Sequence, residues 1–288
     1  MDGIINVYKP VGMTSHDVVN KIRRIAGTKK VGHTGTLDPD AEGVLPICIN
    51  RGTKVADMLT VSDKRYTAEF KLGIITDTLD IGGTVLEERS VNVTKQQIID
   101  TIKSFVGVIE QVPPMYSAIK VGGKKLCDLA RKGIEVERKS RTVEIHEINI
   151  IDVKENTFTI DVKCSKGTYI RTLGSDIGEK LGCGAVMTKL VRTQSSIFKV
   201  DDAVKLENLT PENYCDYVTL AVDLFDGEKI TVNEDILSKV LNGNAIPYAG
   251  VEGNYYKLYD NNDRLLCLSK MEDGMLKVEI MFCVGEQQ

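Results

Sequence analysis

Residues 65–72 read Arg-Tyr-Thr-Ala-Glu-Phe-Lys-Leu, and polar and apolar side chains alternate along the whole stretch. A period of two places one kind of side chain on each face of an extended chain, which is typical of a β-strand with one buried face. Two further alternating runs, over residues 141–153 and 157–164, predict a hairpin that turns at Glu155-Asn156. Strands of this kind indicate a sheet in which antiparallel pairing dominates.

Helices are predicted between these strands. Thr14-Ser15 marks the start of a helix over residues 16–26, and Thr94 with Gln97 forms a capping box ahead of another. A third helix is expected near residues 169–181. Because strands and helices are intermixed without a regular β-α-β rhythm, the order favours the α+β class, with a mixed, mainly antiparallel sheet flanked by helices.

The end of the chain predicts a separate unit. Asn233 is placed to cap a helix, and short strands follow near residues 255–260, 264–270 and 275–283. We therefore expect two domains: residues 1–228, which include a connector near 201–228, and a small, mostly β module over 229–288.

Charge is distributed unevenly along the chain. The whole sequence has 37 basic and 41 acidic residues and a net charge of −4, but residues 201–288 alone hold 17 acidic and 7 basic side chains. The first 200 residues are therefore net positive, and residues 119–141 contain eight basic side chains against three acidic ones. Such a stretch suits contacts with nucleic-acid phosphates, although a charge run is more often only a solvated surface.

Several classes of protein are disfavoured. No run approaches the roughly 20 apolar residues that cross a bilayer, and the start of the chain has no signal-type apolar segment, so we expect a cytoplasmic protein without a membrane partner. The seven cysteines include no C-x-x-C pair, and the three histidines are widely spaced. This pattern predicts neither a disulfide framework nor a structural zinc site.

The segment over residues 31–43 contains three glycines, one histidine and three carboxylates, without helical or strand periodicity. It is either an ordinary surface loop or a catalytic one. A calcium loop is excluded, because Ile49 stands where the bidentate carboxylate of an EF-hand is needed. A phosphate-binding P-loop is excluded as well, because no Gly-Lys-Ser/Thr follows the glycines.

Five blocks of sequence together are more specific than any of them alone. They are Tyr8-Lys9-Pro10 with Gly12-Met13-Thr14-Ser15, Gly32-His33-Thr34-Gly35-Thr36-Leu37-Asp38-Pro39, Asp63-Lys64-Arg65-Tyr66, Pro113-Pro114-Met115-Tyr116-Ser117-Ala118 and Lys166-Gly167-Thr168-Tyr169-Ile170-Arg171. In this order the blocks closely resemble the bacterial TruB-type tRNA pseudouridine-55 synthases. The resemblance is strong over residues 3–195, and the C-terminal module is weakly similar to the PUA-like domain of that family.

This resemblance implies three catalytic residues. Asp38 matches the catalytic aspartate, and Arg171 matches the arginine that pairs with it. Tyr66 matches the tyrosine that stacks on the target base and is placed to move a proton. A guanidinium beside a carboxylate favours its ionised form, so we expect a lowered pKa for Asp38.

The resemblance also implies substrate-binding residues and a reaction. His33 matches the histidine beside the displaced nucleotide, Tyr169 lines the uracil site together with Tyr66, and Leu190 supplies an apolar contact to the base. The implied enzyme is an isomerase that converts uridine 55 of the tRNA T-loop to pseudouridine on a flipped-out nucleotide. It needs no cofactor, no metal and no obligatory protein partner, and a monomer is expected.

Two other functions stay open. A catalytically silent tRNA-binding or folding protein on the same scaffold has no reason to retain Asp38 together with Arg171. A metal-dependent hydrolase that uses Asp38, Asp40 and Glu42 is the third possibility, and it would lose its activity to a chelator.

Overall fold

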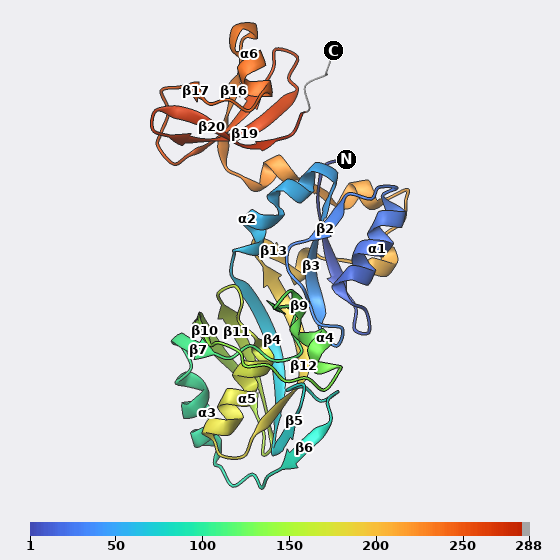
Figure 1. The fold of residues 1–288 in the computed structure, drawn as a ribbon, viewed down its shortest axis with the longest axis vertical. Coiled ribbons are helices and arrows are strands. Elements are labelled where there is room, and N and C mark those ends of the chain that lie inside the picture. Colours follow the sequence, from blue (N-terminus) through green and yellow to red (C-terminus); the bar gives the residue numbers. More distant parts are fainter. Residues whose placement is uncertain (284–288) are drawn as a thin grey trace.

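The alternating stretch forms β4 (Lys64–Leu72) in the middle of an 11-stranded sheet. We describe residues 1–283 in a computed structural model of the chain (Figure 1). Strand β4 pairs in antiparallel fashion with β11 (Thr157–Cys164) on one side and β12 (Ala185–Ser195) on the other. Phe70 is buried and stacks on Phe158 of β11 with 5.0 Å between the ring centroids. The predicted half-buried strand is therefore confirmed.

Two halves of the sheet meet at β12, whose Val191 and Arg192 pair in parallel with β3 (Glu42–Ile49). The path through the sheet is β14-β1-β3-β12-β4-β11-β10-β7. The other strands on or beside it are β1 (Gly3–Lys9), β2 (Val31–His33), β7 (Gly107–Gln111), β10 (Arg141–Val153), β13 (Phe198–Lys199), β14 (Val204–Lys205) and β15 (Val218–Leu220). Within this sheet, as described over residues 1–283, only β1 with β14 and β12 with β3 pair in parallel, which confirms a mixed, mainly antiparallel sheet.

The predicted helix starts are confirmed. Thr14 caps α1 (Ser15–Ile25) in a capping box with Asp17, and Thr94 caps α3 (Lys95–Lys103) in one with Gln97. Helix α5 (Ile170–Lys180) packs its buried residues against the core of β4, β11 and β12. Short helices α2 (Ala56–Thr60) and α4 (Leu126–Ala130) complete this part. Two small hairpins are built from β5 (Ile74–Thr76) with β6 (Val85–Glu88), and β8 (Lys120–Val121) with β9 (Lys124–Lys125).

The end of the chain forms a second sheet, which is separate from the first (Figure 1). Its order is β16 (Gly227–Thr231), β18 (Tyr255–Tyr259), β19 (Leu265–Glu272), β20 (Met275–Met281) and β17 (Ile246–Pro247), and α6 (Glu234–Leu241) accompanies it. Apolar side chains of this module pack in one cluster with the first part of the chain; they include Leu268, Ile280 and Phe282 on one side and Leu59 and Val222 on the other.

The boundary region differs in detail from the expected connector. Strands β14 and β15 lie within residues 201–228, and both pair with β1, so this segment adds strands to the first sheet. Strand β16 already begins at Gly227. The division into 1–228 and 229–288 stays a prediction. Within residues 1–283, no helix has the length and apolar character needed to cross a membrane.

The close approach of α5 to β4 gives a test of this packing. A Cβ added at Gly174 would lie 2.0 Å from Cε1 of Phe70. Gly174→Ala should therefore lower the free energy of unfolding by about 1–3 kcal/mol, the usual cost of overpacking. Gly32→Ala is the control, since its Cβ would meet only Cγ2 of Thr53 at 4.0 Å. Equal denaturation midpoints for the two variants would contradict the packing described here.

Candidate active site

The loop that carries Asp38 is fixed to the start of α1. The hydroxyl of Ser15 accepts a hydrogen bond from the amide of Leu37 at 2.8 Å and donates to its carbonyl at 3.0 Å. On the other side of Asp38, the carbonyl of Pro39 accepts from the amide of Gly12 at 2.8 Å and from Nζ of Lys9 at 3.2 Å. Both residues that flank Asp38 are thus held, which explains why the first two sequence blocks occur together.

A second anchor comes from the sheet. Arg192 is buried, and its Nε, Nη1 and Nη2 donate to the carbonyls of Val44, Thr36 and Gly35 at 2.7, 3.3 and 3.2 Å. Strand β12 therefore fixes the loop just before Asp38. Arg192 also lies opposite Tyr66 in the pairing of β12 with β4, so one residue connects the loop and the strand that bear two predicted site residues.

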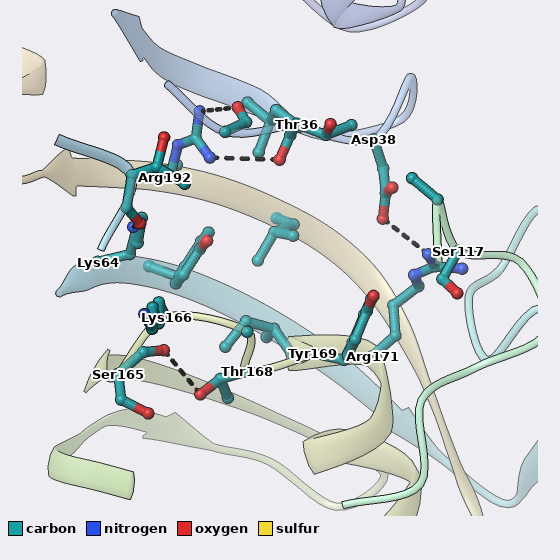
Figure 2. A pocket seen from close by; sticks show the side chains of 18 of the residues that line it. Thr36, Asp38, Lys64, Ser117, Ser165, Lys166, Thr168, Tyr169, Arg171 and Arg192 are labelled. Atoms are coloured by element: carbon teal, nitrogen blue, oxygen red, sulfur yellow. Dashed lines mark hydrogen bonds and ion pairs between the residues drawn. The ribbon is translucent and has the colours of Figure 1, made fainter. Parts of the chain in front are cut away.

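Asp38 points to Arg171, whose side chain is 6% exposed (Figure 2). Nη2 of Arg171 lies 2.9 Å from Oδ2 of Asp38 and donates to the carbonyl of Tyr116 at 2.8 Å. Nη1 donates to the carbonyl of Thr78 at 3.0 Å and lies 3.5 Å from Oδ2 of Asp80. The guanidinium is therefore shared between two carboxylates and two carbonyls, which fixes its orientation.

The expected direction of the Asp38 pKa is wrong. Burial raises the pKa of Asp38 above its usual value, and the negative charge of Asp80 adds to this effect. Arg171 acts in the opposite direction, as expected, but it does not outweigh the loss of water. The resemblance implied the ion pair but not the partial burial of the carboxylate, whose side chain remains 39% exposed.

A cavity of about 770 Å³ opens beside Asp38. Its volume lies in the upper part of the range for ligand pockets. Tyr66 of β4, Leu190 of β12 and Tyr169 line it together with Asp38 and Arg171, so five of the six predicted site residues share one cavity. Among the side chains of the lining, five are basic and only Asp38 is acidic.

Tyr169 is held at the start of α5 by contacts that the sequence did not reveal. The side chain of Gln111, which is buried at the end of β7, accepts from the amide of Tyr169 at 3.0 Å and donates to its carbonyl at 3.3 Å. The guanidinium of Arg141 lies 5.7 Å from the centroid of the Tyr169 ring. The turn before α5 therefore presents Tyr169 and Arg171 in fixed positions.

His33 is the predicted residue that the cavity does not include. It is only partly exposed on β2, and its Nδ1 accepts a hydrogen bond from the amide of Gly35 at 3.2 Å. Burial and the charge of Arg192 lower the pKa of His33, which keeps the ring neutral with its proton on Nε2.

Burial raises the pKa of Tyr66, so its phenol stays protonated at neutral pH.

The three carboxylates of the loop do not converge. Glu42 lies 3.7 Å from Nζ of Lys189, Asp40 is exposed, and only Asp38 faces the cavity. Within residues 1–283, no three His, Cys, Asp or Glu side chains are placed to share a metal ion.

Sequence reasoning missed three residues that organise the site. Asp80, Gln111 and Arg192 act on Arg171, Tyr169 and the Asp38 loop over sequence separations of 91, 58 and more than 140 residues. A partial signal existed only for Asp80, since Asp77-Thr78-Leu79-Asp80 is a turn-forming segment between two strands. The contacts of the other two depend on strand pairing.

Comparison with known proteins shows the class of protein to which this chain belongs. A model described as "TruB family pseudouridylate synthase (N terminal domain)" matches residues 23–170, and one described as "tRNA pseudouridylate synthase B C-terminal domain" matches residues 171–221. A chain of a Cbf5-Nop10-Gar1 complex superposes with a TM-score of 0.70 at 29% identity, over 98% of this chain and 85% of that one. The fold is thus that of a pseudouridine synthase, which is an isomerase.

Relatives give the particular family. A tRNA pseudouridine synthase B of Clostridium kluyveri is 44% identical over 98% of this chain and 100% of its own length. One of Alkaliphilus oremlandii is 51% identical over 85% of this chain and 83% of its own length. The chain belongs to the TruB family of tRNA pseudouridine synthases.

The clamp on Leu37 gives a test of the loop geometry. Ser15→Ala would leave the buried amide and carbonyl of Leu37 without that partner, which should cost about 1–3 kcal/mol of stability. Turnover should also fall, because Leu37 precedes Asp38. Thermal unfolding and kcat on tRNA check both effects, with Ser238→Ala on the exposed face of α6 as the control. If Ser15→Ala matched Ser238→Ala in both measurements, the clamp would have no role.

Proposed function

We propose that this protein isomerises uridine 55 in the T-loop of tRNA to pseudouridine, with Asp38 as the catalytic carboxylate. The observation that carries the proposal is the position of Asp38 at the wall of a cavity of about 770 Å³, 2.9 Å from a buried arginine and in a lining that is otherwise neutral or basic.

The reaction requires little beyond this arrangement. The N1–C1′ bond of uridine breaks, the uracil rotates and C5 joins C1′; C5 then loses its proton to solvent and N1 takes one up, so the product is an isomer of the substrate. Neither a net redox change nor the transfer of a group to another molecule occurs, so the chemistry requires no cofactor. An ionised carboxylate can begin the reaction by attacking the nucleotide or by removing the C2′ proton, and Asp38 suits either route.

Arg171 and Asp80 together fix the orientation of that carboxylate and act on its pKa in opposite directions. The guanidinium holds Oδ2 of Asp38 in one direction, and Asp80 holds the guanidinium from its other side. Because the cavity keeps the detached uracil close to its sugar, rotation and rejoining can compete with loss of the base.

The aromatic rings offset the cost of extruding the nucleotide. Turning a base out of its stack costs a few kcal/mol, and a stack on an aromatic side chain returns about 1–3 kcal/mol. We assign this stacking to Tyr66, with Tyr169 and Leu190 as further walls of the uracil site. His33 lies outside the lining of the cavity, on the neighbouring β2, which suits a contact with a displaced nucleotide rather than with the target base.

The basic stretch over residues 119–141 begins at the rim of the cavity. Ser117, Ala118 and Ile119 line it, and the lysines of β8 and β9 follow on an exposed hairpin. Because Tyr116, just before this rim, accepts a hydrogen bond from Arg171, RNA held by the hairpin adjoins the catalytic pair. Recognition of the T-arm by shape and by extruded bases fits this layout.

A silent tRNA-binding protein is the alternative, and the retained pair of Asp38 and Arg171 argues against it. Action as a monomer, without cofactor or obligatory partner and in the cytoplasm, stays a prediction. The structural relative Cbf5 occurs in a complex with Nop10 and Gar1.

Asp38→Asn tests the central assignment. The amide cannot act as nucleophile or base, so release of tritium from 5-tritiated uridine in unmodified tRNA should fall at least about 10²–10⁴-fold, while tRNA binding should stay within a few-fold of wild type. Asp40→Asn, exposed two residues further along the loop, is the matched control and should retain activity. Normal turnover by Asp38→Asn would refute the assignment, and loss of activity with a chelator would favour the metal-dependent alternative.

The pH dependence tests the electrostatics. Asp38 must be ionised, so activity is lost as the pH falls through its pKa. Because burial raises that pKa, the acidic limb of the pH–activity profile should lie above the pKa of about 3.9 of an ordinary aspartate. Asp80→Asn removes a negative charge that raises the pKa of Asp38, so the limb should move to lower pH although turnover falls. Single-turnover rates against pH give the result, with Asp100→Asn on α3 as the control. A limb that did not move would show that Asp80 does not act on Asp38.

A further inference from the structure

The cavity has a second end, away from Asp38 and Arg171, where Lys64 and Arg192 lie (Figure 2). Lys64 is the first residue of β4, and Arg192 lies on the neighbouring β12. No step of the proposed reaction is assigned to these two residues, although Tyr66 lies opposite Arg192 in the pairing of β4 with β12. Both positive charges at this end are buried.

Both cations are withdrawn from water without a carboxylate partner. Lys64 is 8% exposed and Arg192 is 1% exposed, and within residues 1–283 neither lies within 4.0 Å of an acidic oxygen. Nζ of Lys64 donates to the carbonyls of Thr60 and Ser62 at 2.6 and 2.5 Å, and Arg192 donates to three carbonyls of the Asp38 loop and β3. Lys64 has one N–H left and Arg192 has two. Buried charges are normally paired, so this arrangement is costly as it stands.

The two cations also act on each other. Burial lowers the pKa of Lys64 to about 8, and the charge of Arg192 is the next largest cause. Weaker effects come from Cys164, Asp63 and Lys166 around it. Two like charges held together in a low-dielectric wall repel, and an anion between them would relieve that repulsion.

Thr34 supplies an independent sign of a missing partner. It is 1% exposed and lines the cavity, and its hydroxyl has no hydrogen-bond partner within the described residues 1–283. It adjoins the residues that bind the two cations: its carbonyl accepts from the hydroxyl of Thr60 at 3.1 Å, Thr60 in turn binds Lys64, and its neighbour Gly35 binds Arg192. A buried hydroxyl without a partner is costly, so a group that accepts a hydrogen bond is expected here.

We propose that Lys64, Arg192 and Thr34 form a phosphate subsite, which binds a phosphodiester group adjoining the target uridine. The inference rests on the proposed function, because a nucleotide that enters the cavity brings a phosphate on each side of its sugar. One phosphate in this subsite balances both cations and accepts from the hydroxyl. The extruded nucleotide is then held at two points, its base near Asp38 and its backbone at the far end.

Variants separate phosphate binding from a structural role. Binding of a T-arm RNA hairpin is measured by fluorescence anisotropy at pH 7 over a series of salt concentrations. Lys64→Met should weaken binding about tenfold and reduce the slope of log K against log[salt] by about 0.7–0.9, the change for one phosphate contact. Lys71→Met, exposed on the same strand, is the matched control and should change neither. An unchanged slope for Lys64→Met would overturn the proposal.

Thr34→Val is a second test of the subsite, which does not depend on whether Lys64→Met folds. Loss of an unpartnered buried hydroxyl should leave the melting temperature unchanged or higher. RNA binding should nevertheless weaken about threefold with the salt slope unchanged, since the hydroxyl has no charge. Binding equal to wild type would remove Thr34 from the subsite and contradict the proposal.

Replacing single phosphodiesters of the RNA by uncharged analogues shows which phosphate occupies the subsite. A methylphosphonate is placed on one side or the other of the target uridine in the hairpin, and wild-type protein should lose about tenfold in affinity at one of the two positions. Lys64→Met should lose nothing further at that position. Additive losses, or no loss at either linkage, would overturn the subsite. The proposed function is checked separately by tritium release from the unmodified hairpin, so failure of one does not imply failure of the other.

Discussion

The site depends on the pairing of one buried guanidinium. Arg171 has lost its contact with water, so its charge needs partners within the fold, and two carboxylates and two carbonyls surround it. These partners come from the Asp38 loop, from the turn between β5 and β6, and from the segment ahead of the basic hairpin. Pairing the charge therefore brings three distant segments together and places the catalytic carboxylate at the cavity.

The remaining contacts turn a glycine-rich loop into a rigid one. Ser15, Lys9 and Arg192 all bind its backbone rather than its side chains, so the loop has a fixed path while Asp38 stays free to face a substrate. Two of these anchors are buried cations, and together with Lys64 they make the surroundings of Asp38 positive. A positive wall attracts a polynucleotide, and it also favours the ionised form of Asp38, against the effect of burial.

Local patterns in the sequence predicted much of the fold. The alternation in β4, the hairpin of β10 and β11, the N-cap of α1 and the capping box of α3 involve near neighbours, and all are confirmed. Strand β2 was missed, because three residues within a loop of mixed composition have no detectable period, and it exists only by pairing with β3. The raised pKa of Asp38 was missed because burial, unlike an ion pair, has no local sequence signal.

The sequence by itself determined which side chains could carry the chemistry, since carboxylate, guanidinium and aromatic ring are properties of Asp38, Arg171 and Tyr66 wherever they lie. Only the tertiary structure decided that these residues meet at one cavity, that Asp80 and Gln111 hold Arg171 and Tyr169, and that Lys64 and Arg192 face the same space with no acidic partner among residues 1–283. The physical reason is the distance along the chain over which the interactions act. Secondary structure follows from interactions over a few residues, whereas burial, charge pairing and cavity shape depend on contacts between segments far apart in the chain.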